Sequence, residues 1–347
     1  MKAAQWPISR RDFAAGLAVM AGAAAAPKSA ASPGMEPKVK VGLYSITYLG
    51  VWYRGDALSI EQVIQRARQF GYDGVEIDGK RPHANPLDMP PGRCRELRAL
   101  AAGQGIEIYA VAANNDFSSP IPEHRESQLL YARELIRVTA DLGAKLMRVF
   151  LAWPGVTFLP EGGARYDIAQ SAWRQVHQPF SEQQTWEWCR QSLLEAARQA
   201  GDHGVTLALQ NHPPVIRGYA DCLRMVREVG SPHLKVCFDA RLEHSLDAAG
   251  IERAVREVGP LQVLSHFGGE YEQGPDGIRA TEAAQCLAEA RGLMAIGYQG
   301  YLGFELCHPL PVVDGKTVGI DFVDKNARLA AEYMRSVLAR ARTESRG

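Results

Sequence analysis

From Val39 onward the chain repeats one pattern of apolar and polar positions. A short run rich in β-branched and apolar residues is followed by a stretch in which apolar residues recur every three or four positions. The runs are typical of buried strands, and the stretches are typical of amphipathic helices. The strands expected from this pattern are Val39–Thr47, Gly74–Gly79, Ile106–Asn115, Ala144–Trp153, Val205–His212, Leu234–Ala240, Leu261–Gly268 and Gly300–Cys307.

A helix is expected after each strand. The predicted helices lie near Ile60–Phe70, Gly92–Gly103, Glu123–Leu142, Glu182–His203, Tyr219–Val229, Ile251–Val258, Thr281–Ala295 and Asp321–Arg342. Eight successive strand–helix units favour an α/β fold whose parallel sheet closes into a (β/α)8 TIM barrel. The rival is an open doubly wound sheet, which would want a glycine-rich phosphate loop after the first strand. The segment Gly42–Ser45 is not such a loop.

The longest insertion in this pattern is Pro154–Ser181, which follows the fourth strand and is rich in Gly, Pro and aromatic residues. In a barrel, the loops that follow strands lie at the C-terminal face, where the site is found. The insertion is therefore predicted to be a loop that covers the substrate.

The first 35 residues do not follow the repeat. An arginine pair, Arg10 and Arg11, has Phe13 two positions on, and an Ala/Gly-rich run from Ala14 to Ala26 follows. This segment resembles a twin-arginine export signal. We expect a signal peptide and linker over residues 1–35, a barrel over residues 36–347, and export to the periplasm or otherwise by the twin-arginine route.

Composition narrows the partners. The 39 Lys and Arg residues balance 39 Asp and Glu residues, which argues against a nucleic-acid partner and against a polybasic membrane surface. The body holds no apolar run long enough for stable membrane insertion. The six cysteines are scattered without a CxxC motif, and we interpret them as small hydrophobic residues. Homo-oligomerisation is left open.

Alternation along the strands predicts which polar side chains face the barrel lumen. The apolar positions of each strand must face the helices, so the polar positions between them point inward. On the last four strands the inward set is Gln210, His212, Asp239, His266 and Glu305, and the same rule adds Glu76, Asp78 and Arg148. All of these lie near the C-terminal ends of their strands, where barrel enzymes carry their chemistry.

Carboxylate, imidazole and amide groups that converge on one axis are costly to bury unless they are paired or bind a metal. Oxygen and nitrogen donors of this kind suit Mn²⁺ or Mg²⁺, and Co²⁺ or Zn²⁺ would also fit them. The sequence therefore predicts a divalent metal held by Gln210, Asp239, His266 and Glu305. The alternative is a hydrogen-bonded ion cluster without metal.

These segments resemble the xylose-isomerase-like TIM barrel superfamily, which includes the sugar phosphate isomerases and epimerases. The resemblance rests on the segments Gly71–Glu76, Leu207–His212, Cys237–Asp239, Ser265–Phe267 and Gly300–Glu305. It implies a metal set of Glu, Asp, His and Glu on the last four strands. Gln210 departs from that set, because an amide stands where the family has a carboxylate. A symmetric mechanism with two glutamates is therefore put in doubt.

Other positions complete the predicted site. Glu305 is the expected catalytic base, and His212 or His244 could supply a second proton-transfer group. Arg148, Trp153 and Tyr48 are expected to contact the substrate. Glu76 either joins them or forms an ion pair with Arg148.

The expected function is a metal-dependent sugar isomerase or epimerase that removes a proton next to a carbonyl group. Its substrate would be a small carbohydrate, either a non-phosphorylated sugar or a related polyol, since export argues against sugar phosphates. One alternative is a lyase or dehydratase that performs β-elimination on a 3-oxo-glycoside or cyclitol. Another is a non-catalytic sugar-binding barrel.

Overall fold

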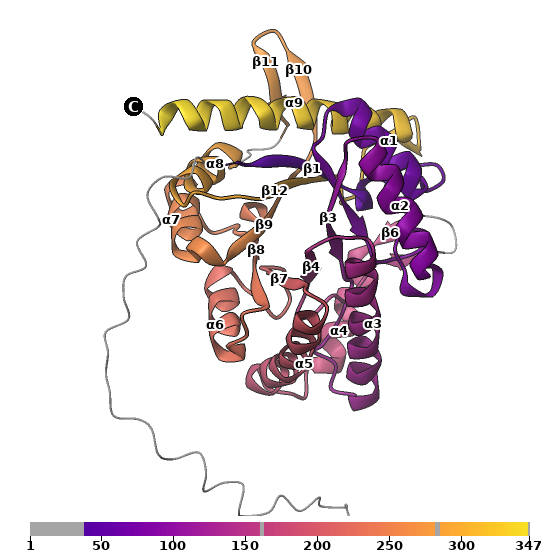
Figure 1. The fold of residues 1–347 in the computed structure, drawn as a ribbon, viewed down its shortest axis with the longest axis vertical. Coiled ribbons are helices and arrows are strands. Elements are labelled where there is room, and N and C mark those ends of the chain that lie inside the picture. Colours follow the sequence, from indigo (N-terminus) through magenta and orange to yellow (C-terminus); the bar gives the residue numbers. More distant parts are fainter. Residues whose placement is uncertain (1–37, 160–162, 282–284, 346–347) are drawn as a thin grey trace, which may run out of the picture. The chain divides into compact units, whose positions relative to one another are not determined.

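The computed structural model describes residues 38–159, 163–281 and 285–345. Eight parallel strands form a closed barrel in the order β1-β12-β9-β8-β7-β4-β3-β2 (Figure 1). The (β/α)8 prediction is therefore confirmed, and every predicted strand is present in a shorter form. The barrel strands are β1 (Lys40–Tyr44), β2 (Gly74–Asp78), β3 (Glu107–Ala112), β4 (Leu146–Val149), β7 (Thr206–Gln210), β8 (Leu234–Phe238), β9 (Gln262–Gly268) and β12 (Tyr301–Glu305).

Helices surround the barrel and cover the outer faces of its strands (Figure 1). The helices that follow the barrel strands are α1 (Ile60–Phe70), α2 (Pro91–Gly103), α3 (Pro122–Asp141), α5 (Glu182–Asp202), α6 (Tyr219–Val229), α7 (Ala248–Val258), α8 (Cys286–Ala295) and α9 (Ile320–Glu344). Each matches a predicted helix. The apolar stripe of each helix packs on outward-facing strand residues such as Val41, Leu207 and Val236, which are fully buried.

Local signals set the ends of these helices. Ser59 caps α1 through a reciprocal pair of hydrogen bonds with Gln62, and Ser181 and Gln184 do the same for α5. Gly71 ends α1 with φ of 78°, a left-handed conformation that glycine adopts without strain. These caps place the strand that follows α1, and with it Glu76, at a fixed register.

Aromatic rings fill the lower part of the barrel. Tyr109 of β3 stacks on Tyr301 of β12 with ring centroids 3.9 Å apart. The tyrosine fits because Gly42 and Gly303 present no side chain toward it, and a Cβ on Gly303 would lie 2.8 Å from the Tyr109 hydroxyl. The polar residues above this layer therefore rest on a packed floor rather than on an open channel.

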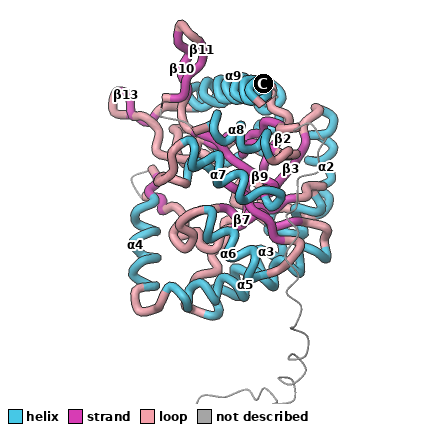
Figure 2. Tube along the Cα trace, turned by 90° about the vertical axis from the view of Figure 1, so that its left-hand side faces the viewer, coloured by secondary structure: helices cyan, strands magenta, loops and turns pink. Residues whose placement is uncertain are grey.

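The sequence predicted a loop for the insertion after β4, but the structure contains regular elements there. Its described part forms two short strands, β5 (Thr157–Phe158) and β6 (Ala164–Arg165), and the helix α4 (Tyr166–His177). Figure 2 shows α4 at the periphery, outside the barrel strands. Trp173 and His177 of α4 stack at 3.9 Å, and His177 bonds the Ser118 carbonyl oxygen at 2.9 Å. This helix was missed because its apolar face packs on neighbouring loops, not on the sheet.

Two small hairpins also lie outside the predicted pattern: β10 (Tyr271–Gly274) with β11 (Gly277–Ala280), and β13 (Val312–Val313) with β14 (Lys316–Thr317). The first projects past α9 (Figure 1). Five of the six cysteines are buried, and Cys307 is partly exposed. Among the described residues, no helix has the length and apolarity needed to span a membrane. The predicted export signal lies outside the described residues.

Candidate active site

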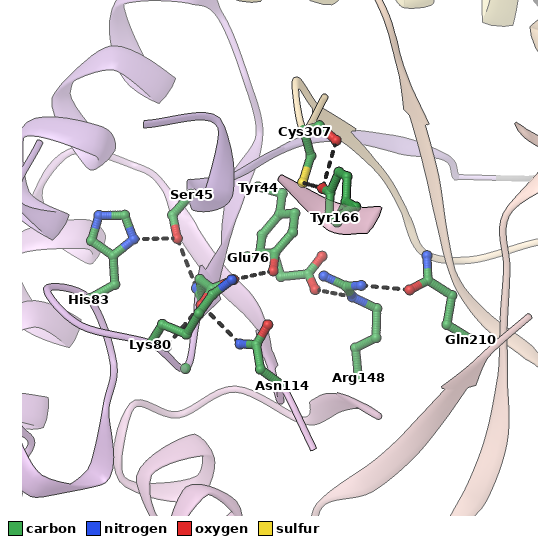
Figure 3. Close-up of polar contacts among 12 residues, drawn as sticks. Tyr44, Ser45, Glu76, Lys80, His83, Asn114, Arg148, Tyr166, Gln210 and Cys307 are labelled. Atoms are coloured by element: carbon green, nitrogen blue, oxygen red, sulfur yellow. Dashed lines mark hydrogen bonds and ion pairs between the residues drawn. The ribbon is translucent and has the colours of Figure 1, made fainter. Parts of the chain in front are cut away.

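Three inward-facing side chains from three strands form a continuous row in the barrel lumen. Nε of Arg148 donates to Oε1 of Glu76 at 2.8 Å, and Nη1 of Arg148 donates to Oε1 of Gln210 at 2.6 Å (Figure 3). All three residues are at most 3% exposed. They come from β2, β4 and β7, and they occupy positions that alternation along the strands had predicted to face inward.

A histidine from the opposite side of the barrel completes the contacts of Glu76. Nε2 of His266, on β9, lies 2.6 Å from the second carboxylate oxygen of Glu76. A carboxylate only accepts hydrogen bonds, so Nε2 of His266 carries the proton. Its Nδ1 faces Sγ of Cys237 at 3.4 Å and accepts from that thiol. Both ring nitrogens of His266 therefore have partners inside the protein.

These contacts keep the buried groups in defined charge states. Burial opposes ionisation of Glu76, but Arg148 and His266 outweigh it and lower the pKa of Glu76 to about 2. Burial raises the pKa of the Cys237 thiol, which keeps it protonated as a donor. The pKa of Arg148 is raised despite burial, chiefly by Glu76. A fixed anion and a fixed cation thus share the lumen.

Aromatic rings hold the Arg148 guanidinium in place. It lies 4.6 Å from the ring centroid of Tyr44 and 5.2 Å from that of Phe150. The Tyr44 hydroxyl donates to Asp78, which fixes that ring in turn. Nη2 of Arg148 is buried and has no hydrogen-bond partner among the described residues.

A second group of polar residues adjoins this row. Asp239 follows β8 directly and accepts a hydrogen bond from Nε2 of Gln210 at 3.3 Å and another from the backbone N–H of Arg241 at 3.0 Å. Nη1 of Arg241 lies 3.4 Å from Oε1 of Glu305 at the end of β12. The Glu305 side chain is 15% exposed, so its carboxylate reaches the mouth of the barrel.

The predicted metal set does not fit a divalent ion in this arrangement. The described residues contain no group of three or more His, Cys, Asp or Glu side chains placed to hold a metal. Both nitrogens of His266 are engaged, and the Gln210 oxygen accepts from Arg148. A guanidinium also lies beside Glu305. As the structure places them, these side chains do not form the four-ligand metal centre, which stays a prediction from the sequence.

His212 and Trp153 lie at the mouth on one side of the lumen. They line a cavity of about 210 Å³ with Tyr166 and Trp173, and their rings meet edge-on at 5.1 Å. Nδ1 of His212 donates to the Pro213 carbonyl oxygen at 2.6 Å, which leaves Nε2 as the unprotonated nitrogen. Burial is the main cause that lowers the pKa of His212 to about 4. The imidazole is therefore neutral at pH 7 and able to accept a proton.

His244 is not brought to the same place. It is exposed and lines a different cavity of about 310 Å³, together with Arg241, Glu270 and Glu289. No hydrogen bond joins His244 to Glu305 within the described residues. The structure thus separates the two histidines that the sequence offered as second proton-transfer groups.

Tyr48 requires a correction. Its side chain is fully buried, and its hydroxyl donates to Asp324 of α9 at 2.8 Å. The aromatic ring therefore belongs to the core between barrel and helix and does not line a sugar pocket. The prediction was wrong because Tyr48 lies after β1 in a 3-10 turn, Ser45–Tyr48, where strand alternation no longer applies.

Sequence reasoning missed Tyr44, Phe150 and Arg241. Tyr44 is the last residue of β1 and Phe150 directly follows β4, both at inward positions. The alternation rule could have found them, but it was applied only to charged and polar side chains. Arg241 lies two residues after Asp239, in the 3-10 turn Ala240–Leu242 that follows β8. Its contact with Glu305 depends on the turn's conformation, which the sequence pattern does not reveal.

A closed barrel with polar groups at the C-terminal ends of its strands has the architecture of barrel enzymes. The chain belongs to a particular family of this fold, the xylose isomerase-like TIM barrels, whose family model matches residues 64–311.

Two relatives by sequence are epimerases. The chain is 26% identical over 182 residues to fructoselysine 3-epimerase of Escherichia coli O157:H7, a match that covers 51% of this chain and 60% of that protein. It is 26% identical over 197 residues to 2-epi-5-epi-valiolone 7-phosphate 2-epimerase of Actinoplanes sp., covering 56% and 62%. The matched segments thus span about three fifths of each relative.

Solved structures share the fold over almost their whole length. D-psicose 3-epimerase of Clostridium cellulolyticum H10, solved with D-tagatose, aligns with a TM-score of 0.64 at 20% identity and covers 86% of this chain and 99% of that one. The 3-keto-D-glucoside 4-epimerase of E. coli aligns with a TM-score of 0.59 at 20% identity, covering 88% and 100%.

Proposed function

We propose that this protein is a sugar isomerase or epimerase that moves a proton on the carbon next to a carbonyl group. The substrate class is a non-phosphorylated sugar or a related polyol. Membership of the xylose isomerase-like barrels and the two epimerase relatives support the reaction class. The preference for a sugar without phosphate rests on the export signal that the first 35 residues resemble.

The observation that carries the proposal is that Glu305, at the end of β12, and His212, two residues after β7, both lie at the barrel mouth. Glu305 is close enough to raise the pKa of His212, while burial and Arg148 lower it. The Glu305 side chain is partly exposed, and the His212 imidazole is neutral at pH 7 and able to accept a proton. A substrate held between them would meet a base on either side.

In this scheme Glu305 removes the proton beside the carbonyl, and His212 exchanges a proton with the other side of the reacting carbon or with its neighbour. Return of the proton to the same carbon from the other side inverts that centre, which is epimerisation. Return to the neighbouring carbon moves the carbonyl, which is isomerisation. The scheme uses a single carboxylate base and therefore accommodates the amide at Gln210.

The test is solvent deuterium exchange. Purified protein would be incubated in D₂O with a panel of free ketoses, including D-fructose, D-tagatose and D-psicose, and followed by NMR. Deuterium should enter the carbon next to the carbonyl without fragmentation of the sugar. Absence of exchange from the whole panel would contradict the proposal. Release of the aglycone from a 3-oxo-glycoside would instead support the β-elimination alternative.

Export by the twin-arginine route is a separate proposal. It is supported by the arginine pair and the Ala/Gly-rich run that follows it. Cell fractionation checks it: replacing Arg10 and Arg11 by lysine should retain the protein in the cytoplasm, and unchanged export would contradict it.

A further inference from the structure

Arg148 carries a positive charge inside the barrel, and its three guanidinium nitrogens differ in their partners. Its Nε and Nη1 donate to Glu76 and Gln210. Its Nη2 is buried and lacks a partner within the described residues. Buried donors in folded proteins are nearly always paired, by the protein or by ordered water, and each exception calls for an explanation. Within the described residues, Nη2 of Arg148 is therefore available to donate to a ligand oxygen.

We propose that Nη2 of Arg148 binds the carbonyl oxygen of the substrate and holds the oxygen anion formed when Glu305 removes the neighbouring proton. This inference rests on the function proposed above. It gives the guanidinium the task that a divalent ion performs in a metal-dependent enolisation. The reaction then proceeds with the protein's own cation.

The step balances without a further reactant. The Glu305 carboxylate takes the proton, and the electron pair of the broken C–H bond forms the C=C bond of an enediolate. The π pair of the carbonyl group moves onto its oxygen, which becomes the anion that accepts a hydrogen bond from Nη2 of Arg148. Return of a proton to carbon reverses these movements and releases the oxygen as a carbonyl group.

The guanidinium is fixed before the substrate arrives. Two hydrogen bonds and two ring faces, those of Tyr44 and Phe150, hold it in one orientation. Glu76, which orients Nε, is itself held by His266. A donor that needs no reorientation stabilises a developing anion more strongly than a mobile one. Lysine could not replace it, since one ammonium group cannot reach Glu76, Gln210 and a substrate oxygen in this planar arrangement.

Gln210 has a defined part in this arrangement. Its amide oxygen accepts from Arg148 while its amide nitrogen donates to Asp239. A carboxylate at this position could not donate to Asp239, and it would place a second negative charge beside that residue. It would also give Arg148 a second carboxylate partner beside Glu76. The amide therefore leaves the guanidinium with one carboxylate partner, which fits the departure from the family pattern.

Binding of oxalate tests the proposal directly. Oxalate is a planar anion whose adjacent oxygens resemble those of an enediolate. Titration calorimetry with the whole chain in excess EDTA should show that oxalate binds without a divalent metal. Removing the EDTA and adding Mn²⁺ should not be needed for binding. Arg148→Lys should weaken binding about tenfold to a hundredfold, the usual range for one lost charge-assisted hydrogen bond.

Two further variants make the result decisive. Arg198→Lys changes an exposed arginine of α5 in the same way and should bind oxalate like the wild type. Gln210→Glu retains Arg148 but places a second carboxylate beside it, and should also weaken the binding of an anion, so the test stands if Arg148→Lys fails to fold. Circular dichroism reports the fold of each variant.

Three results would overturn the inference: no oxalate binding in EDTA, binding that requires Mn²⁺, or wild-type affinity in a folded Arg148→Lys or Gln210→Glu protein. Failure of the proposed function has a different appearance. In that case no ketose exchanges deuterium under any metal condition, while oxalate still binds in a manner that depends on Arg148.

Discussion

Gln210 accepts a hydrogen bond from Nη1 of Arg148 at 2.6 Å, so a neutral amide faces the cation of the barrel lumen. The same amide donates to Asp239 at 3.3 Å. Considered without its contacts, Gln210 would be interpreted as a weak metal ligand. Its two partners show instead that only a side chain with both a donor and an acceptor satisfies this position.

Gln210→Glu places a second carboxylate beside Arg148, which already pairs with Glu76, and loses the hydrogen bond to Asp239. We expect kcat/KM to fall by about tenfold to a hundredfold, and added Mn²⁺ should not restore it. A variant that binds Mn²⁺ and gains activity would instead support the metal centre predicted from the sequence.

Glu305→Gln tests the base. The amide keeps the size of the side chain and a contact for Arg241, but it cannot accept a proton. Deuterium exchange should slow by about 10²- to 10⁴-fold, the usual contribution of a general base, and the melting temperature should change little because Glu305 reaches the mouth. Exchange at the wild-type rate would assign the base to another residue.

The acid limb of the pH profile reports His212. Burial lowers the pKa of His212 to about 4, so the neutral imidazole persists far into acid. The value of kcat/KM should therefore rise with pH through about 4 and remain level above it up to neutral pH. His212→Asn should remove or displace this limb. A limb that stays in place in the variant would show that a different group titrates.

A buried acid next to the site predicts how stability depends on pH. Burial raises the pKa of Glu289 to about 8. Ser265 lies within hydrogen-bond distance of both Glu289 and the Phe238 carbonyl oxygen, and its one proton serves the carbonyl if Glu289 is protonated. The folded state thus holds the proton of the Glu289 carboxyl group more tightly than the unfolded state does. Its stabilising effect is complete below about pH 4.5 and is lost as pH rises to about 8.

Glu289→Gln should therefore unfold at a higher denaturant concentration than the wild type at pH 9, by a difference on the order of a few kcal/mol. The exposed Glu126→Gln on α3 is the matched control and should not change the pH dependence. A wild type equally stable at pH 5 and pH 9 would contradict the raised pKa.

The packed floor of the barrel makes a prediction about stability alone. A Cβ on Gly42 would overlap the ring of Tyr109, which is itself stacked on Tyr301. Gly42→Ala should cost about 1–3 kcal/mol of unfolding free energy. Gly103→Ala, at the end of α2 with open space around it, should be neutral or slightly stabilising. Equal stabilities in urea titrations would show that the floor adjusts freely.

The fold was predictable because each of the eight predicted strands and eight predicted helices has its own periodic pattern of apolar residues. Alternation along strands also identified the inward positions of Glu76, Arg148, Gln210 and His266, since strand geometry alone decides them. Asp239 lies one residue beyond β8, yet it keeps the inward direction. Regular elements thus carried the inward-facing positions of the candidate site.

The rest depended on contacts between distant segments. Alternation indicates that His266 faces inward, but not that Glu76 and Cys237 occupy both of its nitrogens. Nor does it place Tyr48 against Asp324, since Tyr48 lies in a turn. The missed helix α4 has its partners in loops such as the one that contains Ser118. Pair interactions of this kind follow from the closed barrel and not from a local pattern.

The rate of deuterium exchange after exhaustive dialysis against EDTA tests the account most directly, measured on whichever ketose of the panel exchanges fastest. We predict that the dialysed protein exchanges deuterium at the same rate as the undialysed protein, and that adding Mn²⁺ or Mg²⁺ does not change this rate. In Arg148→Lys the rate should fall about tenfold or more. A rate that falls to that of Glu305→Gln and returns with Mn²⁺ would contradict the account and give the cation's task to a metal.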